Sequence, residues 1–150
     1  LAFLGALMSL SVERTEYAEG RVLGIHMQGL NKAEHSLINA PKLCERVRTH
    51  GYEGLIMNYQ GCRFDHTVSQ FAKVAEILSA GMPPALRIAY VYDETNLMHA
   101  AYITRLMKSA GLNARALGGF EDALAFASGE ADDTSQTVKA QGPTKPNLLP

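Results

Sequence analysis

The stretch from Gly54 to Ala80 constrains the fold most, because a buried strand, a polar turn and a helix follow one another directly. Residues 54–59 are mostly apolar on both alternating faces, which is typical of an interior strand covered on two sides. Residues 60–67 form the predicted turn, and residues 68–80 carry one apolar stripe at helical spacing. Ligand and regulatory sites of open α/β sheets gather where a strand ends and the next helix begins, so we expect a site here.

Two short runs before this stretch predict a β-hairpin. Residues 11–17 alternate in polarity, and residues 21–27 resume a strand-like pattern after a turn that contains Gly20. Two such runs joined by a glycine-bearing turn favour antiparallel pairing. Residues 28–31 are expected to close the second strand.

A helix is expected to follow this hairpin. Asn31 is placed to cap it, and Glu34 stands three residues on, in the capping-box position. The helical pattern continues until Gly51, which acts as a stop. Pro41 interrupts the pattern, and proline is tolerated only in the first turn of a helix. We therefore expect either a kink or two shorter helices, the second of which begins near Asn39.

The second half of the chain repeats the alternation of strand and helix. Residues 86–92 form the strongest strand pattern, residues 97–110 an amphipathic helix, residues 113–117 a short strand and residues 121–127 a last helix. The complete order is β-β-α-β-α-β-α-β-α. This order predicts a single α/β domain with a mainly parallel sheet, in which the amino-terminal hairpin supplies an antiparallel edge.

Composition restricts the class of protein. A chain of 150 residues with 47% hydrophobic residues suits one domain with a substantial core. The formal net charge is -1 and the Lys and Arg residues are scattered, so binding of nucleic acid through a basic stripe is not expected. Cys44 and Cys62 have no close partner spacing, which suits reduced thiols in a cytoplasmic protein.

The two ends of the chain differ from the segment between them. Residues 1–10 are apolar but too short for a membrane-spanning helix, which needs about 20 residues. We interpret them as an extension of the domain, and the alternative is a short arm that packs on a neighbour or a membrane. Residues 129–150 lose periodicity and are expected to be a disordered tail, which leaves residues 11–128 as the domain.

The element order and three segments resemble the STAS domains. The segments are Gly29–Glu34, Leu86–Asp93 and Ala114–Phe126. More closely, they look like the bacterial SpoIIAA-like group, also described as STAS/SEC14 domain proteins, over nearly all of residues 11–128. The resemblance implies a small regulatory or carrier domain that has no catalytic activity and no cofactor. It also implies a cytoplasmic location, with peripheral membrane association as an alternative.

In the anti-sigma factor antagonists of this superfamily, a kinase phosphorylates a Ser or Thr within an Asp-Ser-Ser/Thr-Gly pattern at the start of a helix. A new dianion at that position breaks docking by repulsion and desolvation. Here Asp65 matches the pattern, whereas His66 stands at the usual acceptor and Val68 at the glycine. Thr67 and Ser69 remain as candidate acceptors.

The resemblance therefore implies a docking surface for another protein, such as a kinase or another regulator. A homodimer is a further alternative that the sequence leaves open. The predicted partner-binding residues lie in the turn before the helix that starts near residue 68 and after the strand at 86–92: Arg63, Phe64, Asp65, His66, Thr67, Asp93, Glu94 and Asn96.

The SEC14-related alternative is a domain that binds a lipid or another apolar ligand. A lipid carrier would contain a closed apolar cavity on the order of several hundred Å³, whereas a docking module would have a shallow face near Asp65. Large apolar residues are usually consumed by core packing. The candidates for lining a cavity are Met57, Tyr59, Phe64, Phe71, Tyr90 and Tyr92.

Three chemical sites find no support in the sequence. Cys62, Asp65 and His66 could suggest a catalytic set, but neighbours in sequence rarely face one another as a triad requires. The five histidines have no metal-ligand spacing, and no phosphate-binding glycine pattern is present. A response-regulator receiver would begin with an apolar strand and an acidic pair, whereas this chain begins with a hairpin. We therefore expect no enzyme.

Overall fold

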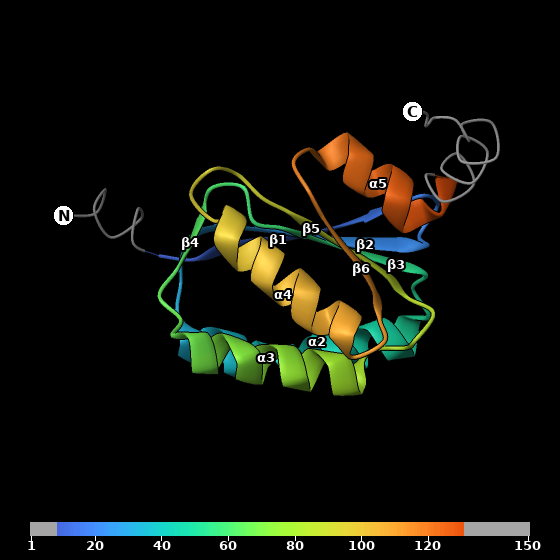
Figure 1. The fold of residues 1–150 in the computed structure, drawn as a ribbon. Helices are drawn as coiled ribbons and strands as arrows, with labels where there is room; N and C mark the ends of the chain where they lie inside the picture. Colours follow the sequence, from blue (N-terminus) through green and yellow to red (C-terminus); the bar gives the residue numbers. More distant parts are fainter. Residues whose placement is uncertain (1–8, 131–150) are drawn as a thin grey trace, which may run out of the picture.

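A computed structural model describes residues 9–130 of the chain, so most of the expected extension and of the expected tail lie outside the described residues. The described part contains six strands and four helices (Figure 1). Their bounds are β1 (Ser11–Tyr17), β2 (Val22–Asn31), α2 (Ala33–His50), β3 (Gly54–Asn58), β4 (Cys62–Phe64), α3 (Val68–Gly81), β5 (Arg87–Val91), α4 (Leu97–Ser109), β6 (Asn113–Leu117) and α5 (Phe120–Ser128).

The sheet has the predicted architecture. Its strand order is β1-β2-β3-β5-β6, and β4 pairs with β2 outside this path. Strand β1 runs antiparallel to β2, with Ser11 opposite Gln28 and Tyr17 opposite Val22, and the other pairs are parallel. The prediction of an α/β domain with a mainly parallel sheet and a hairpin edge is therefore confirmed.

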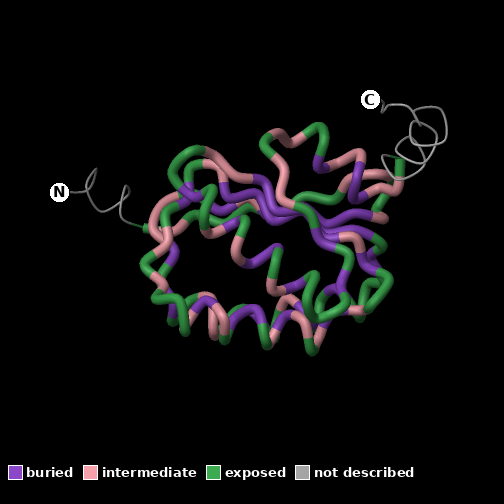
Figure 2. The backbone as a smooth tube through the Cα atoms, in the orientation of Figure 1, coloured by how far each residue is buried: buried purple, intermediate pink, exposed green. Residues whose placement is uncertain are grey.

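Helices cover both faces of the sheet. Helices α2, α3 and α4 lie on one side and α5 on the other (Figure 1). All five residues of β3 are buried, as expected for a strand covered on both faces, and the buried segments of the chain concentrate in the strands (Figure 2). Leu55 and Met57 belong to the larger apolar cluster under α2 to α4, while Ile56 belongs to the smaller cluster under α5.

The predicted turn at residues 60–67 contains the strand β4, which the sequence analysis did not include. Gly29 pairs with Cys62 and Asn31 pairs with Phe64 in parallel register. Residues 28–31 close β2 as expected, and residues 29–31 gain β4 as a partner. A strand of three residues is too short to produce a recognisable period in the sequence.

The prediction that Pro41 divides this helix into two shorter ones is wrong, because α2 is continuous from Ala33 to His50 with Pro41 inside it. The alternative of a kink at Pro41 stays a prediction. Pro41 is itself exposed, and it removes one backbone hydrogen bond of the helix. The predicted cap is also wrong: Lys32 occupies the N-cap position, whereas Asn31 is buried at the end of β2. Gly51 ends the helix in the left-handed conformation, as predicted.

Helix α3 packs against α2 and α4, and its Phe71 ring lies 5.5 Å from the ring of Phe64 on β4. Its amino end has a complete capping box, in which Thr67 Oγ1 accepts from the N–H of Gln70 and Gln70 Oε1 accepts from the N–H of Thr67. At its carboxyl end, the guanidinium of Arg48 on α2 donates to the carbonyl of Gly81 at 2.6 Å. Contacts with α2, α4 and β4 therefore hold α3 in place.

Candidate functional site

The structure brings together the two loops that the sequence analysis expected to be neighbours. The N–H of Gly61 donates to Asp93 Oδ2 at 2.7 Å. Asn96 Nδ2 donates to the carbonyls of Tyr59 and Cys62 at 2.6 and 2.8 Å, and its Oδ1 accepts from the N–H of Asp93 at 2.9 Å. Asn96 is only 1% exposed. Asn96 therefore holds the two loops together. Because its side chain is buried, it can affect a partner only through the conformation of these loops.

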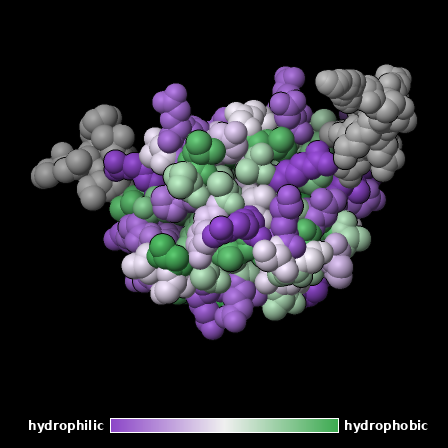
Figure 3. Space-filling model, viewed as in Figure 1, coloured by the Kyte–Doolittle hydropathy of each residue, from purple (hydrophilic) through white to green (hydrophobic). Residues whose placement is uncertain are grey.

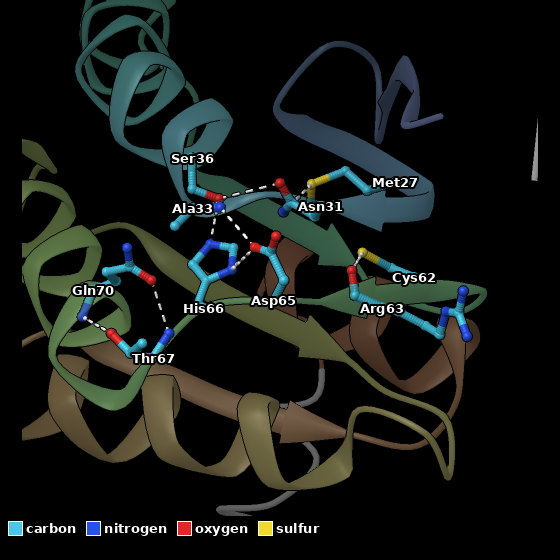
Figure 4. A network of polar contacts seen from close by, with 10 residues as sticks. All are labelled: Met27, Asn31, Ala33, Ser36, Cys62, Arg63, Asp65, His66, Thr67 and Gln70. Atoms are coloured by element: carbon cyan, nitrogen blue, oxygen red, sulfur yellow. Dashed lines mark hydrogen bonds and ion pairs between the residues drawn. The ribbon is translucent and has the colours of Figure 1, made fainter. Parts of the chain in front are cut away.

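Asp65 and His66 bind the amino end of α2 (Figure 4). The carboxylate of Asp65 accepts from the N–H of Ala33 at 3.0 Å. His66 Nε2 lies 2.9 Å from the hydroxyl of Ser36, which in turn donates to Asn31 Oδ1 at 3.3 Å. Asp65 therefore closes a different helix from the one that it precedes, and this role joins residues 32 positions apart in the sequence.

The ring of His66 lies in an aromatic cluster. Ring centroids of Phe64 and His66 are 5.3 Å apart, and those of Phe64 and His99 are 5.0 Å apart. Phe71 contacts both histidines, at 5.3 Å and 5.6 Å. Burial lowers the pKa of His66, against the opposing effect of Asp65, and burial also lowers the pKa of His99. Both rings are therefore favoured in the neutral form.

The remaining predicted residues of this corner face solvent to different degrees. Arg63, Thr67, Ser69 and Glu94 are exposed, and Phe64 is half-buried. The hydroxyl of Thr67 accepts a hydrogen bond within the capping box, whereas no such role is recorded for Ser69. The two candidate phosphate acceptors are thus both on the surface, and only Thr67 also stabilises the helix.

Cys62, Asp65 and His66 do not form a nucleophile and base. Cys62 is fully buried on β4, and its thiol is directed to the carbonyl of Arg63 at 3.7 Å. Burial, with a smaller effect of Asp93, raises the pKa of the Cys62 thiol to about 12. A thiol with a raised pKa is a poor nucleophile at neutral pH. Among residues 9–130, no three His, Cys, Asp or Glu side chains are grouped as a metal site would require.

A second candidate site is a pocket between the sheet and the helices α2 and α3. Its volume is about 310 Å³. The lining side chains that are exposed come from β1 and α2, so the pocket opens between these two elements. The pocket is lined by Leu10, Val12, Arg14, Ile25, Met27, Asn31, Ser36, Asn39, Ala40, Lys42, Leu43, Arg46, Met57, Tyr59, Phe64, Phe71, Val74, Leu78 and Ile103.

Four of the six residues proposed as a cavity lining do line this pocket: Met57, Tyr59, Phe64 and Phe71. Tyr90 and Tyr92 do not line it, and Tyr90 is buried in the core. Leu10, which the sequence analysis grouped with the amino-terminal extension, packs on the core and lines the pocket.

Sequence reasoning missed the basic side chains of the pocket. Arg14 lies on β1, and Lys42 and Arg46 lie four residues apart on α2. The helical spacing of Lys42 and Arg46 is a signal that could have placed both on one face of the helix. Their proximity to Arg14 depends on how α2 lies over the hairpin, which no local pattern specifies.

Comparisons with known proteins find similarity among solved structures. No protein-family model matches the chain, and no curated protein matches it. Among solved structures, the anti-sigma factor antagonist SpoIIAA in its unphosphorylated form is similar, with 13% sequence identity and a TM-score of 0.45 over 84% of this chain and 98% of the SpoIIAA chain. A similarity at this identity and TM-score assigns neither a family nor a site to the chain. Within the described residues, none of the helices has the length and hydropathy needed to span a membrane.

Proposed function

We propose that this domain is a non-catalytic binding module that holds an apolar ligand in the pocket beneath α2 and α3. The observation that carries the proposal is the pocket itself. Its volume of about 310 Å³ lies at the lower end of the roughly 300–1,000 Å³ typical of ligand sites. Its inner wall consists of large apolar side chains, among them Met57, Phe71 and Leu78.

The cost of empty space supports this proposal. Protein interiors are close-packed and contain few voids larger than a water molecule, because a cavity forfeits the contacts of the atoms that line it. Met57, Phe71 and Leu78 are nevertheless arranged around a pocket that reaches the surface. An apolar ligand would restore the lost contacts and remove apolar surface from water.

The proposal is tested by filling the pocket. Ala40 is buried in its wall, so Ala40→Phe places a ring in the space of the ligand, while Ala101→Phe adds the same ring at an exposed position of α4 as a control. We expect the wild-type chain and Ala101→Phe to bind the neutral probe N-phenyl-1-naphthylamine with a rise in fluorescence, and Ala40→Phe to lose binding while it unfolds cooperatively. Absence of probe binding by the wild-type chain would refute the proposal.

A second candidate function is docking of a partner protein through residues 61–69 and the adjoining loop at residues 93–96. The surface at the amino ends of α3 and α4 favours it. Val68, Leu97 and Met98 are 72%, 42% and 77% exposed there, which is a high exposure for large apolar side chains. Figure 3 shows hydrophobic side chains among hydrophilic ones on the face that carries these two helices. Charged and apolar groups side by side suit recognition of a protein.

Docking is tested with a photo-cross-linking amino acid in place of Val68 in cells, with Ile38 as a control position. Ile38 is also exposed, at 59%, but lies on α2. A docking surface predicts one discrete adduct from position 68 that is absent from position 38. The adduct should be lost in Ser69→Glu, which imitates a phosphate without removing the Thr67 cap. Equal labelling from both positions would contradict this second candidate.

A further inference from the structure

We propose that the ligand of the pocket is a single-chain amphiphile, whose anionic headgroup binds Arg14, Lys42 and Arg46 and whose hydrocarbon chain lies beneath α3. This inference rests on the proposed binding of an apolar ligand and specifies the chemical class of that ligand. It follows from the distribution of charge along the pocket.

The mouth of the pocket is cationic. Three of its lining residues, Arg14, Lys42 and Arg46, are basic, and none is acidic. All three are exposed, and none makes a salt bridge within the part of the chain that the structure describes. The whole chain has a formal net charge of -1, so three cations at one mouth do not follow from a basic composition. Exposed cations that make no salt bridge favour an anion at the opening that they surround.

Two carboxylates stand close to these cations along the chain. Glu45 follows Lys42 by three residues on α2, the spacing of neighbours on a helix surface. Glu16 follows Arg14 on the same face of β1 and accepts a hydrogen bond from the hydroxyl of Tyr52. Burial, together with Glu16, raises the pKa of Tyr52, and Arg46 opposes this effect on the same hydroxyl. Glu16 and Glu45 therefore offset part of the positive charge, but neither lines the pocket, and among residues 9–130 neither forms a salt bridge with Arg14, Lys42 or Arg46. The mouth keeps an excess of positive charge.

The inner part of the pocket is apolar. Its buried apolar side chains come from the strands β2 and β3 and from the helices α2, α3 and α4, and Asn31 is a buried polar residue of the lining. The apolar ones include Ile25, Met27, Ala40, Met57, Phe71, Val74, Leu78 and Ile103. The volume of about 310 Å³ is about ten times the roughly 30 Å³ that one water occupies in the liquid. A chain of about ten carbon atoms would therefore fill it. Polarity falls from the charged mouth to this wall, as it does along an amphiphile.

The chain itself contains a competing occupant. Leu10 lines the pocket, and the apolar residues 1–8 precede it in the sequence. That segment contains no acidic side chain, so it would leave the cations of the mouth without a counter-charge. An amphiphile with an anionic head satisfies both the mouth and the wall, and the charge complementarity therefore favours it.

The test measures displacement of N-phenyl-1-naphthylamine from the full chain by decanoate, decyl phosphate and decanol, each below its micelle concentration. We expect both anions to bind about tenfold more tightly than decanol, and 500 mM salt to weaken only the anions. The double variant Arg14→Gln/Arg46→Gln should lose about tenfold affinity for the anions and none for decanol. The control Lys108→Gln, at an exposed position of α4, should change neither. A preference between decanoate and decyl phosphate distinguishes a fatty acid from a phosphate ester.

The outcomes separate this inference from the proposal on which it rests. Equal affinity for decanoate and decanol, unchanged by the double arginine variant, would overturn the anionic headgroup and leave the apolar pocket intact. Binding that occurs only after deletion of residues 1–8 would assign the pocket to the chain's own segment and would also overturn the inference. No binding of any of the three compounds or of the probe, by either chain, would refute the proposed function itself.

Discussion

The carboxylate of Asp65 accepts the hydrogen bond that the N–H of Ala33 donates at 3.0 Å, so the loop after β4 closes the amino end of α2. The first N–H groups of a helix have no partner within the helix, and an acceptor with negative charge satisfies one of them and interacts favourably with the helix dipole. Lys32, at the N-cap position, makes no side-chain hydrogen bond of this kind. Asp65 therefore supplies, from a distant loop, the side-chain acceptor that the residue at the N-cap of α2 does not provide.

Removal of this carboxylate should destabilise the domain. Asp65→Ala is expected to lower the free energy of unfolding by about 1 kcal/mol, the usual cost of losing a helix cap. Asp65→Asn keeps an acceptor and should lose only part of that amount. Urea denaturation followed by circular dichroism measures both variants. Equal stability of the wild-type chain and Asp65→Ala would show that the contact contributes nothing.

Asn96 should be among the most sensitive polar positions. Asn96→Ala removes a donor from the buried carbonyls of Cys62 and Tyr59, although Tyr59 keeps the N–H of Cys62, and it removes the acceptor of the Asp93 N–H. A buried group left unsatisfied costs about 1–3 kcal/mol. We expect a loss of at least about 2 kcal/mol in the free energy of unfolding. Thr95→Ala changes the neighbouring exposed residue and is the matched control. Similar unfolding midpoints for the two variants would contradict the conclusion that Asn96 holds the two loops together.

Stability should fall in mild acid because of two histidines. Burial lowers the pKa of His66 and His99 below the ordinary 6.5, so the unfolded chain binds more protons than the folded chain at and below that pH. The stabilising contribution is therefore complete above about pH 6.5 and is lost as the pH falls through and below that value. His99→Phe should reduce the slope of unfolding free energy against pH between 7 and 5. His35→Gln, at an exposed position, serves as the control, and an unchanged slope in His99→Phe would exclude this cause.

The close approach of α5 to the sheet depends on Gly54. A Cβ at this position would collide with the carbonyl oxygen of Ala127, which is backbone and cannot rotate away. Gly54→Ala is therefore expected to cost about 1–3 kcal/mol, as overpacking usually does. Gly51→Ala, where a Cβ meets nothing within 4 Å but φ is +70°, separates steric collision from backbone strain. Hydrogen exchange should show increased opening of α5 in Gly54→Ala and not in Gly51→Ala.

The sequence predicts the fold well where local patterns and tertiary contacts agree. The apolar run at β3 and the strand at β5 are recognisable from their own residues, and they pair in parallel as the element order requires. Strand β4 was not predicted, because its three residues form a strand only through pairing with Gly29 to Asn31. The division of α2 at Pro41 was predicted wrongly for a related reason. Packing of α2 on the core outweighs the loss of one backbone hydrogen bond at Pro41.

The site divides in the same way. The proximity of Gly61 to Asp93 follows from neighbouring parallel strands, whose carboxyl ends meet at one edge. The acidic cap at Ala33 and the basic mouth with Arg14 and Arg46 do not follow from any local pattern, because each joins side chains from separate elements. Residue types alone indicated that Met57 and Phe71 could line a cavity. Whether such a cavity exists depends on how the helices pack over the sheet, which no local pattern specifies.

The way in which α3 is attached affects the range of ligand sizes that the pocket can accept. The bonds of α3 to other elements include those from Arg48 and Cys44 of α2 to its last carbonyls, and the strands pair without it. An outward tilt of α3 would therefore leave the pairing of the strands unchanged. Substitutions along α3 can therefore change the volume of the pocket while the strands keep their register.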